Sequence, residues 1–186
     1  MKRLLGAALA VAFVGLAAPS DSLAQAAVFI GAGAVSPTGD FKDFGLGDGA
    51  NLGWMATAGV QVPVGDGGLA VGARGFYGVN KHDTDGDKTN LLGGTALATF
   101  SFGAPGALAP FLYGEVGYQA HQYKSESFPS FDDTEWKPFV GGGAGLNFPL
   151  GGLSGFVVAG YNQGFGSDTG NTTYLSGIAG VNIPIG

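Results

Sequence analysis

Apolar and polar residues alternate along most of this chain, and one eight-residue pattern of alternation occurs four times, at residues 58–65, 96–103, 144–151 and 179–186. In each copy, positions one, three, five and seven are apolar, position four is Gln, Thr or Asn, and a glycine ends the pattern. A period of two indicates a β-strand with one face in an apolar medium and the other against polar groups. We therefore expect four strands that end alike, each paired with a strand running the other way.

The alternation and the turn residues between its segments predict eight strands. They span residues 27–35, 52–64, 69–79, 91–102, 110–123, 136–150, 153–165 and 173–185. Tight turns rich in Gly follow the second, fourth and sixth strands, whereas the other connections are mostly longer and polar. The sequence therefore predicts an all-β fold, an eight-stranded antiparallel up-and-down barrel with turns at one end and loops at the other.

The size of the apolar face shows which face of the strands points out of the barrel. Ordinary side chains just fill the interior of an eight-stranded barrel, so the many Val, Leu, Ile and Phe residues of this face do not fit inside. We expect the apolar face to contact lipid, which excludes a soluble barrel with an apolar cavity. The opposite, luminal face gathers polar residues: Gln61, Arg74, Thr95, Thr99, Glu115, Gln119 and Asn147.

Composition and charge agree with a membrane barrel. The chain has 37 glycines, no cysteine and only 12% charged residues, with a formal net charge of −6. Nearly all acidic residues fall in the expected loops, and aromatic residues gather near the strand ends, as at the two interfaces of a membrane. Because outer-membrane barrels have short periplasmic turns and longer external loops, the acidic end should face outward.

The N-terminal residues have the features of a secretory signal peptide. Lys2 and Arg3 provide a basic start, residues 4–18 are apolar, and Ala24-Gln25-Ala26 forms a small-x-small cleavage site. We expect cleavage after Ala26, with cleavage after Ala24 as the alternative. The apolar stretch is too short for a membrane anchor. Residues 1–26 are thus the expected leader, and residues 27–186 the barrel that is exported to the bacterial outer membrane.

Two short motifs carry a resemblance to a known family. Residues 36–41 (SPTGDF) end the first strand, and residues 138–143 (PFVGGG) open the sixth strand ahead of its eight-residue pattern. With the leader and the alternating strands, they resemble the outer-membrane β-barrel domain family that includes the OmpA transmembrane domain, OmpX and the opacity proteins. The resemblance covers essentially the whole mature chain and implies the barrel fold. We expect a protein without cofactor or catalytic activity that acts structurally or as a surface protein through its acidic loops, with a narrow porin-like channel as the alternative.

Arg74 and Glu115 are the candidate functional pair. Each lies six residues into its strand, and the two strands run in the same direction, so the side chains should lie at similar depth in the lumen. We expect a structural ion pair that satisfies both charges and blocks the bore. A transport or gating role in a narrow pore is the alternative.

Other candidate chemistry is weaker. Residues 83–87 (DTDGD) resemble a calcium loop, but Gly86 is fourth instead of sixth and the twelfth position is Gly94. His121 and Glu126 suggest a lipid-modifying barrel enzyme, although the close His-x-Ser spacing is missing. No metal-ligand cluster, phosphate loop or basic nucleic-acid patch is recognisable. We expect a monomer whose acidic loops contact cationic surfaces or divalent cations at lipid headgroups.

Overall fold

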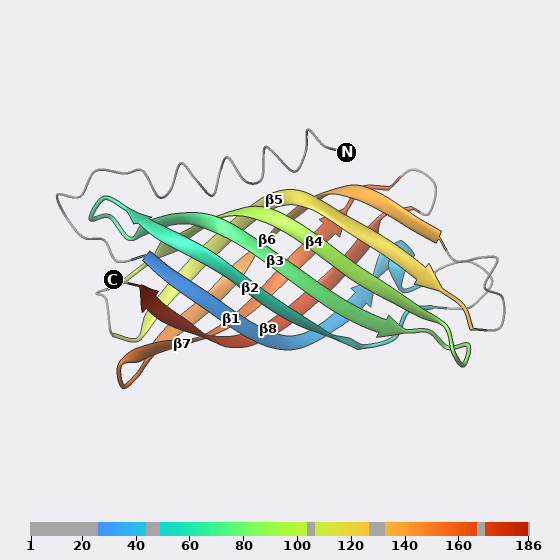
Figure 1. The fold of residues 1–186 in the computed structure, drawn as a ribbon, viewed down its shortest axis with the longest axis horizontal. Helices are drawn as coiled ribbons and strands as arrows, with labels where there is room; N and C mark the ends of the chain where they lie inside the picture. Colours follow the sequence, from blue (N-terminus) through green and yellow to red (C-terminus); the bar gives the residue numbers. More distant parts are fainter. Residues whose placement is uncertain (1–25, 44–48, 104–106, 127–132, 167–169, 186) are drawn as a thin grey trace.

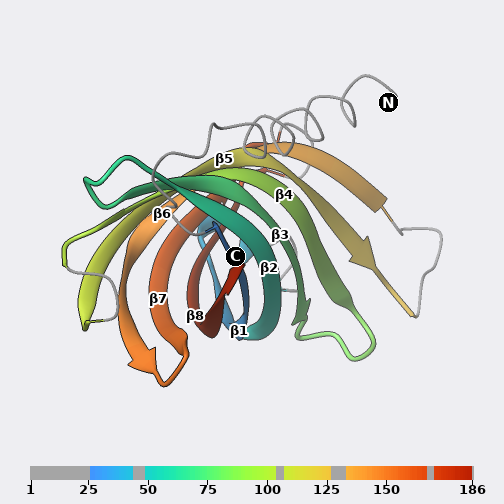
Figure 2. The same ribbon diagram turned by 60° about the vertical axis from the view of Figure 1, so that its left-hand side comes forward.

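The computed structural model describes residues 26–43, 49–103, 107–126, 133–166 and 170–185, and these form a closed barrel (Figure 1). Its elements are β1 (Ala26–Thr38), η2 (Gly39–Phe41), β2 (Gly53–Val64), β3 (Leu69–Lys81), β4 (Lys88–Ser101), β5 (Ala109–Lys124), β6 (Asp133–Leu150), β7 (Leu153–Gly164) and β8 (Thr172–Ile185). Each strand pairs antiparallel with its neighbours in sequence, and β8 closes the barrel on β1 (Figure 2). The predicted fold is therefore confirmed.

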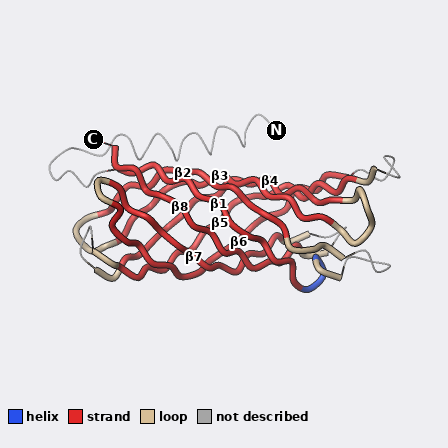
Figure 3. Tube along the Cα trace, turned by 90° about the horizontal axis from the view of Figure 1, so that it is seen from below, coloured by secondary structure: helices blue, strands red, loops and turns tan. Residues whose placement is uncertain are grey.

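The barrel is elongated, and its two ends differ (Figure 3). We call the end with the 3-10 helix η2 and the β3–β4 connection the loop end, and the end with the β2–β3 and β6–β7 turns the turn end. Gly65, Gly68 and Gly151 give the tight turns their positive φ angles of 64°, 79° and 63°, which glycine adopts without steric cost. Among the described residues, no helix has the length and hydropathy of a membrane span. Residues 1–25 of the expected leader (residues 1–26) lie outside the described residues, and its last residue, Ala26, begins β1.

The predicted facing of the third and fifth strands is confirmed. In β3, Val71 and Tyr77 are exposed on the outside, whereas Phe76 is buried in the lumen. In β5, Leu112 and Val116 are exposed and Glu115 is buried. Exposed aromatic residues also gather as expected, Trp54, Tyr77, Tyr118 and Trp136 toward the loop end and Phe100 and Phe102 toward the turn end.

Several strands reach further toward the loop end than the sequence predicted. Residues 36–38 were expected to break the first strand, but β1 stays paired with β8 as far as Thr38 opposite Thr173. Similarly, β4 begins at Lys88 instead of Leu91, and β6 begins at Asp133 instead of Trp136. Backbone hydrogen bonds of a ladder do not require apolar side chains. Beyond the apolar layer the outward positions become polar, so the alternation fades while the strands continue.

Candidate functional site

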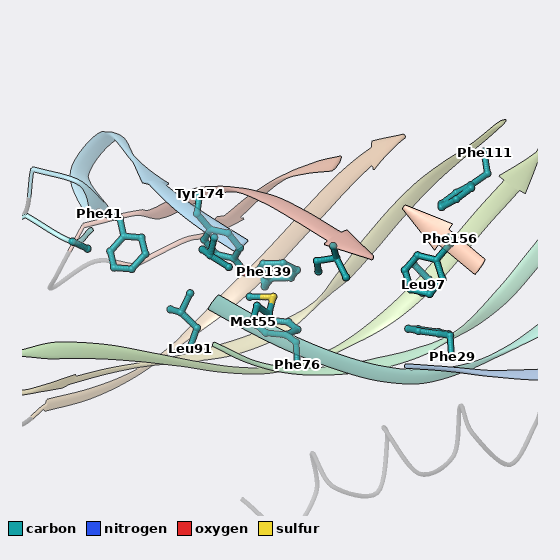
Figure 4. Close-up of a cluster of buried hydrophobic side chains, with 13 residues drawn as sticks. Phe29, Phe41, Met55, Phe76, Leu91, Leu97, Phe111, Phe139, Phe156 and Tyr174 are labelled. Carbon is teal, nitrogen blue, oxygen red and sulfur yellow. The ribbon is translucent and has the colours of Figure 1, made fainter. Parts of the chain in front are cut away.

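The loop half of the lumen is packed with apolar side chains. Phe41, Met55, Leu91, Phe139 and Tyr174 are at most 1% exposed, and Figure 4 shows them as one group with Phe76. The rings of Phe76 and Phe139 lie 5.4 Å apart, and those of Phe139 and Tyr174 lie 6.5 Å apart. Period-two alternation assigns a residue to the inner face but does not make that face polar, so apolar side chains pack there beside the polar ones.

Arg74 and Glu115 meet at the inner boundary of this packed half. Arg74 Nη1 donates to Glu115 Oε1 in a buried ion pair. The Nε of Arg74 donates to Thr57 Oγ1 at 2.8 Å, and Thr95 Oγ1 donates to the second oxygen of Glu115 at 2.7 Å. The guanidinium also lies 5.0 Å from the ring centroid of Phe76. Both charges are therefore held by hydrogen bonds as well as by each other.

A glycine makes room for this pair. A Cβ atom on Gly141 of β6 would lie 2.9 Å from Glu115 Oε1 and 2.7 Å from Asn162 Oδ1. Separations this short require a neighbouring side chain to move. The run of glycines just ahead of the eight-residue pattern in β6 thus leaves the space that the Glu115 carboxylate occupies.

Lys137 is a luminal charge that sequence reasoning missed. Its side chain in β6 is fully buried, and its Nζ donates to the carbonyl of Gly170 at 2.7 Å and lies 3.3 Å from Glu135 Oε2. Lys137 is only the second residue of the predicted sixth strand (residues 136–150), whereas β6 begins at Asp133 and Lys137 lies well inside it. Lys137 lies two residues before luminal Phe139 and therefore on the same face of the strand, so strict alternation would have assigned it to the lumen.

Two histidines lie in a buried polar network near the loop end. His82 Nε2 is 2.8 Å from Thr89 Oγ1, while His121 Nδ1 is 2.7 Å from Thr172 Oγ1. The ring of His121 also packs edge-on against Phe41. Thr89 and Thr172 are at most 1% exposed, so a substrate has no access to their hydroxyl groups. Glu126, the other enzyme candidate, is exposed beside Gly86. This arrangement does not support catalysis.

Asp87 closes the polar network in the β3–β4 connection. Its carboxylate accepts a hydrogen bond from the Tyr123 hydroxyl of β5. That hydrogen bond holds the pKa of the Asp87 carboxyl below its usual value, against the opposing effect of burial. Among the described residues, no group of three or more His, Cys, Asp or Glu side chains is placed to hold a metal ion.

Position four of the repeated pattern forms a polar collar in the turn half of the lumen. We define the collar as Gln61 of β2, Thr99 of β4, Asn147 of β6 and Asn182 of β8, all of which line the same cavity. Gln61 Nε2 donates to Asn182 Oδ1, and Asn182 Nδ2 donates to Asn147 Oδ1, both at 3.4 Å. The four sequence repeats thus bring like side chains together, although Gln61 and Asn182 are 121 residues apart.

The turn half of the lumen is hollow. A cavity of about 730 Å³ extends from the tight turns past the collar to Arg74, Thr57 and Tyr113. The inference that side chains fill the whole lumen was therefore wrong for this half, because Phe29, Leu97, Phe111 and Phe156 line the wall without filling its centre.

Two solved structures of outer-membrane barrels are similar to this chain. Neisserial surface protein A is similar with a TM-score of 0.63 at 15% identity, covering 86% of this chain and 97% of that one. The N-terminal β-barrel domain of OprF from Pseudomonas aeruginosa is similar with a TM-score of 0.52 at 19% identity, covering 86% of this chain and 98% of that one. No protein-family model and no curated protein sequence matches the chain. The chain therefore has the fold of small outer-membrane barrels.

Proposed function

We propose that the chain is a monomeric outer-membrane barrel without catalytic activity, closed to solutes, that acts at the cell surface through the acidic loops of its loop end. The apolar exterior supports the membrane location most directly. Large apolar side chains are exposed around the barrel, among them Ile30, Val60, Val71, Leu112, Val116, Val140, Val157 and Leu175. Water does not favour so continuous an apolar surface, whereas the hydrocarbon of a bilayer does.

Three lysines near the loop end also support the membrane location. Lys81, Lys88 and Lys124 lie directly opposite one another on β3, β4 and β5. They project outward near the loop end, beyond the exposed aromatic residues Tyr77 and Trp136 of the same side. Phosphate groups of lipid headgroups at this level of the membrane would attract these basic side chains.

The packed loop half supports a closed barrel over a narrow pore, which is the alternative. The cavity of the turn half ends at Arg74, and the described residues beyond it, such as Phe76, Phe139 and Tyr174, are buried against one another. Eight strands enclose too little space for a water-filled channel beside such side chains.

The loop end carries most of the acidic groups that are exposed among the described residues. The described residues Asp40, Asp43, Asp83, Asp85 and Glu126 are exposed there, while Asp48, Asp132 and Asp168 lie outside the described residues. A negative surface of this kind attracts cationic surfaces, or lipid headgroups bridged by divalent cations. Exposure and charge together make these loops the region through which the protein acts on its surroundings.

Cell fractionation and conductance test the location and the closed barrel. The protein should be recovered with the outer membrane and should migrate faster on SDS gels before boiling than after. In planar bilayers it should show little or no steady conductance. Recovery from the soluble periplasm would contradict the membrane location, and a stable ion-selective conductance would favour the pore.

Adhesion of intact cells tests the loops. Cells that display the protein should adhere to a polylysine-coated surface, and the double substitution Asp43→Asn, Asp85→Asn should weaken adhesion because it removes two exposed charges of the loop end. Asp66→Asn, in the exposed β2–β3 turn, is the matched control and should leave adhesion unchanged. Equal loss in both variants would refute the role of the loops.

A further inference from the structure

The cavity in the turn half has the properties of a binding site. Its volume of about 730 Å³ falls within the range of about 300–1,000 Å³ that is usual for small-molecule sites. Its wall is mostly apolar, with Phe29, Leu97, Phe111, Phe156 and Ile178 each at most 9% exposed. Such a wall favours an apolar ligand, since burying apolar surface against it removes that surface from water.

Charge is nearly absent from this wall. Among the described residues that line the cavity, only Arg74 and Asp66 are charged. Arg74 lies at the inner end and is paired with Glu115, whereas Asp66 lies in the exposed turn at the mouth. The body of a ligand that fits here is therefore uncharged, and the negative charge at the mouth disfavours an anionic head group.

We propose that the turn half of the lumen binds the acyl chain of a single-chain lipid with an uncharged or zwitterionic head. The chain enters from the turn end and extends toward Arg74. The head group stays at the collar, where the amides of Gln61, Asn147 and Asn182 offer both donors and acceptors. A lysophosphatidylcholine is an example of this chemical class.

The dimensions of the lumen favour one chain over a larger group. Gln61 at the collar and Thr57 at the inner end are four residues apart on β2, which is about 13 Å along the strand. An eight-stranded barrel has room for one narrow ligand at most. A diacyl lipid or a folded protein segment is larger than the one small ligand that the lumen of an eight-stranded barrel holds.

Hydrogen bonding favours an acyl chain over an extended peptide. A peptide would need a partner for every backbone N–H and C=O group that it buries. Between the collar and the inner end the wall consists mainly of Phe29, Leu97, Phe156, Val158 and Ile178, which offer no such partners. An acyl chain has no polar groups to satisfy, so only its head needs the collar.

The hydrogen bonds within the collar can be replaced by hydrogen bonds to a ligand. The two hydrogen bonds that join Gln61, Asn182 and Asn147 are 3.4 Å long, which is longer than the 2.7–3.2 Å usual for strong hydrogen bonds. Replacing them by contacts with an ester, hydroxyl or phosphate oxygen of the head group would therefore cost little. The polar repeat in the sequence and the apolar wall thus fit the two parts of one amphiphilic ligand.

Photolabelling of the full protein in phosphatidylcholine nanodiscs tests the proposal. The probe is a lysophosphatidylcholine with a diazirine on its acyl chain, and a diacyl lipid with the same diazirine is the comparison. Both should label outward Leu112 and Val157, which face lipid. Only the lysolipid should label the luminal residues Leu97, Phe111 and Phe156. Lysolipid label confined to outward residues, or equal luminal label by the diacyl lipid, would overturn the proposal.

Two adjacent valines of β7 supply a matched pair of variants. Val158 lines the cavity, whereas Val157 is exposed on the outside of the barrel. Val158→Trp should lower luminal labelling about tenfold or more. The indole would occupy the space of several methylene groups of the acyl chain, and each methylene group contributes about fourfold to the binding affinity. Val157→Trp should leave it unchanged. An equal effect of both variants would contradict the site.

A second variant keeps the test usable if the first one misfolds. If Val158→Trp loses the gel shift of the folded barrel, Leu97→Phe, a smaller enlargement at the same cavity, replaces it and should still lower luminal labelling. Full labelling of a folded Leu97→Phe barrel would count against the proposal. The labelling pattern of the unmodified protein decides the question independently of either variant.

Discussion

Arg74 and Glu115 form a buried ion pair across β4, with the guanidinium and the carboxylate each held by a further threonine, Thr57 and Thr95 respectively. This pair separates the packed loop half of the lumen from the hollow turn half. Because the Glu115 side chain is fully buried and that of Arg74 is 8% exposed, each charge depends on the other for much of its stabilisation.

Removing one partner should therefore harm the barrel more than removing both. Glu115→Ala should lower the free energy of unfolding by about 3–5 kcal/mol, because it leaves the Arg74 charge buried without its counter-ion. The double variant Arg74→Leu, Glu115→Leu should lose clearly less. Urea unfolding of the barrel in lipid vesicles measures both. Equal losses in the single and double variants would show that the two charges are not coupled.

Substitutions at two consecutive residues of β2 test the facing of the strand. Val60 is 42% exposed on the outer face, whereas Gln61 lines the lumen. Val60→Arg should destabilise the inserted barrel by about 2–4 kcal/mol if the residue lies near the midplane of the bilayer. Gln61→Ala should be mild, since its hydrogen bond to Asn182 is long. The reverse ranking in vesicle unfolding would place β2 one residue out of register.

Gly141 provides a test of the space around Glu115. Gly141→Ala should destabilise the barrel by about 1–3 kcal/mol, as overpacking typically does, because the new methyl group would approach Glu115 Oε1 within 2.9 Å. Gly114→Ala on β5 is the control, because a Cβ there meets no atom within 4 Å. Thermal unfolding in the same detergent compares them, and an equally mild effect of the two substitutions would contradict tight packing at the ion pair.

The hydrogen bond from Tyr123 to Asp87 predicts a dependence on pH. The folded pKa of Asp87 is lowered from its ordinary value of 3.8, chiefly by this bond. Its stabilising contribution is therefore present above that ordinary value and is lost as the pH falls through the folded pKa. Tyr123→Phe should raise the carboxyl pKa in an NMR titration and should destabilise the barrel at neutral pH but not below the folded pKa.

Tyr118→Phe is the matched control for this titration. Tyr118 lies on the same strand but is exposed on the outer face, so its loss should not move the pKa of Asp87. An unchanged Asp87 pKa in Tyr123→Phe would mean that another neighbour, such as Ser125, determines the titration.

The sequence by itself determined the strands, their number and the face of most residues. Period-two alternation needs only local information, because successive side chains of a strand point to opposite sides. It therefore placed Val71 outside and Glu115 inside, and it grouped Gln61 with Asn147 through the repeated pattern. It failed where the outward positions became polar, so β4 and β6 were predicted too short. Lys137 was overlooked although it lay within the predicted sixth strand, on the same face as Phe139.

Only the tertiary structure decided which luminal side chains meet and where the lumen is hollow. Contacts across a barrel depend on its stagger, which accumulates over all eight strand pairings and leaves no local pattern in the sequence. The hydrogen bond from Lys137 to Gly170 and the one from Gln61 to Asn182 both depend on this accumulated stagger. So does the cavity, because alternation assigns Phe29 and Phe156 to the inside but says nothing about whether their rings fill the space between them.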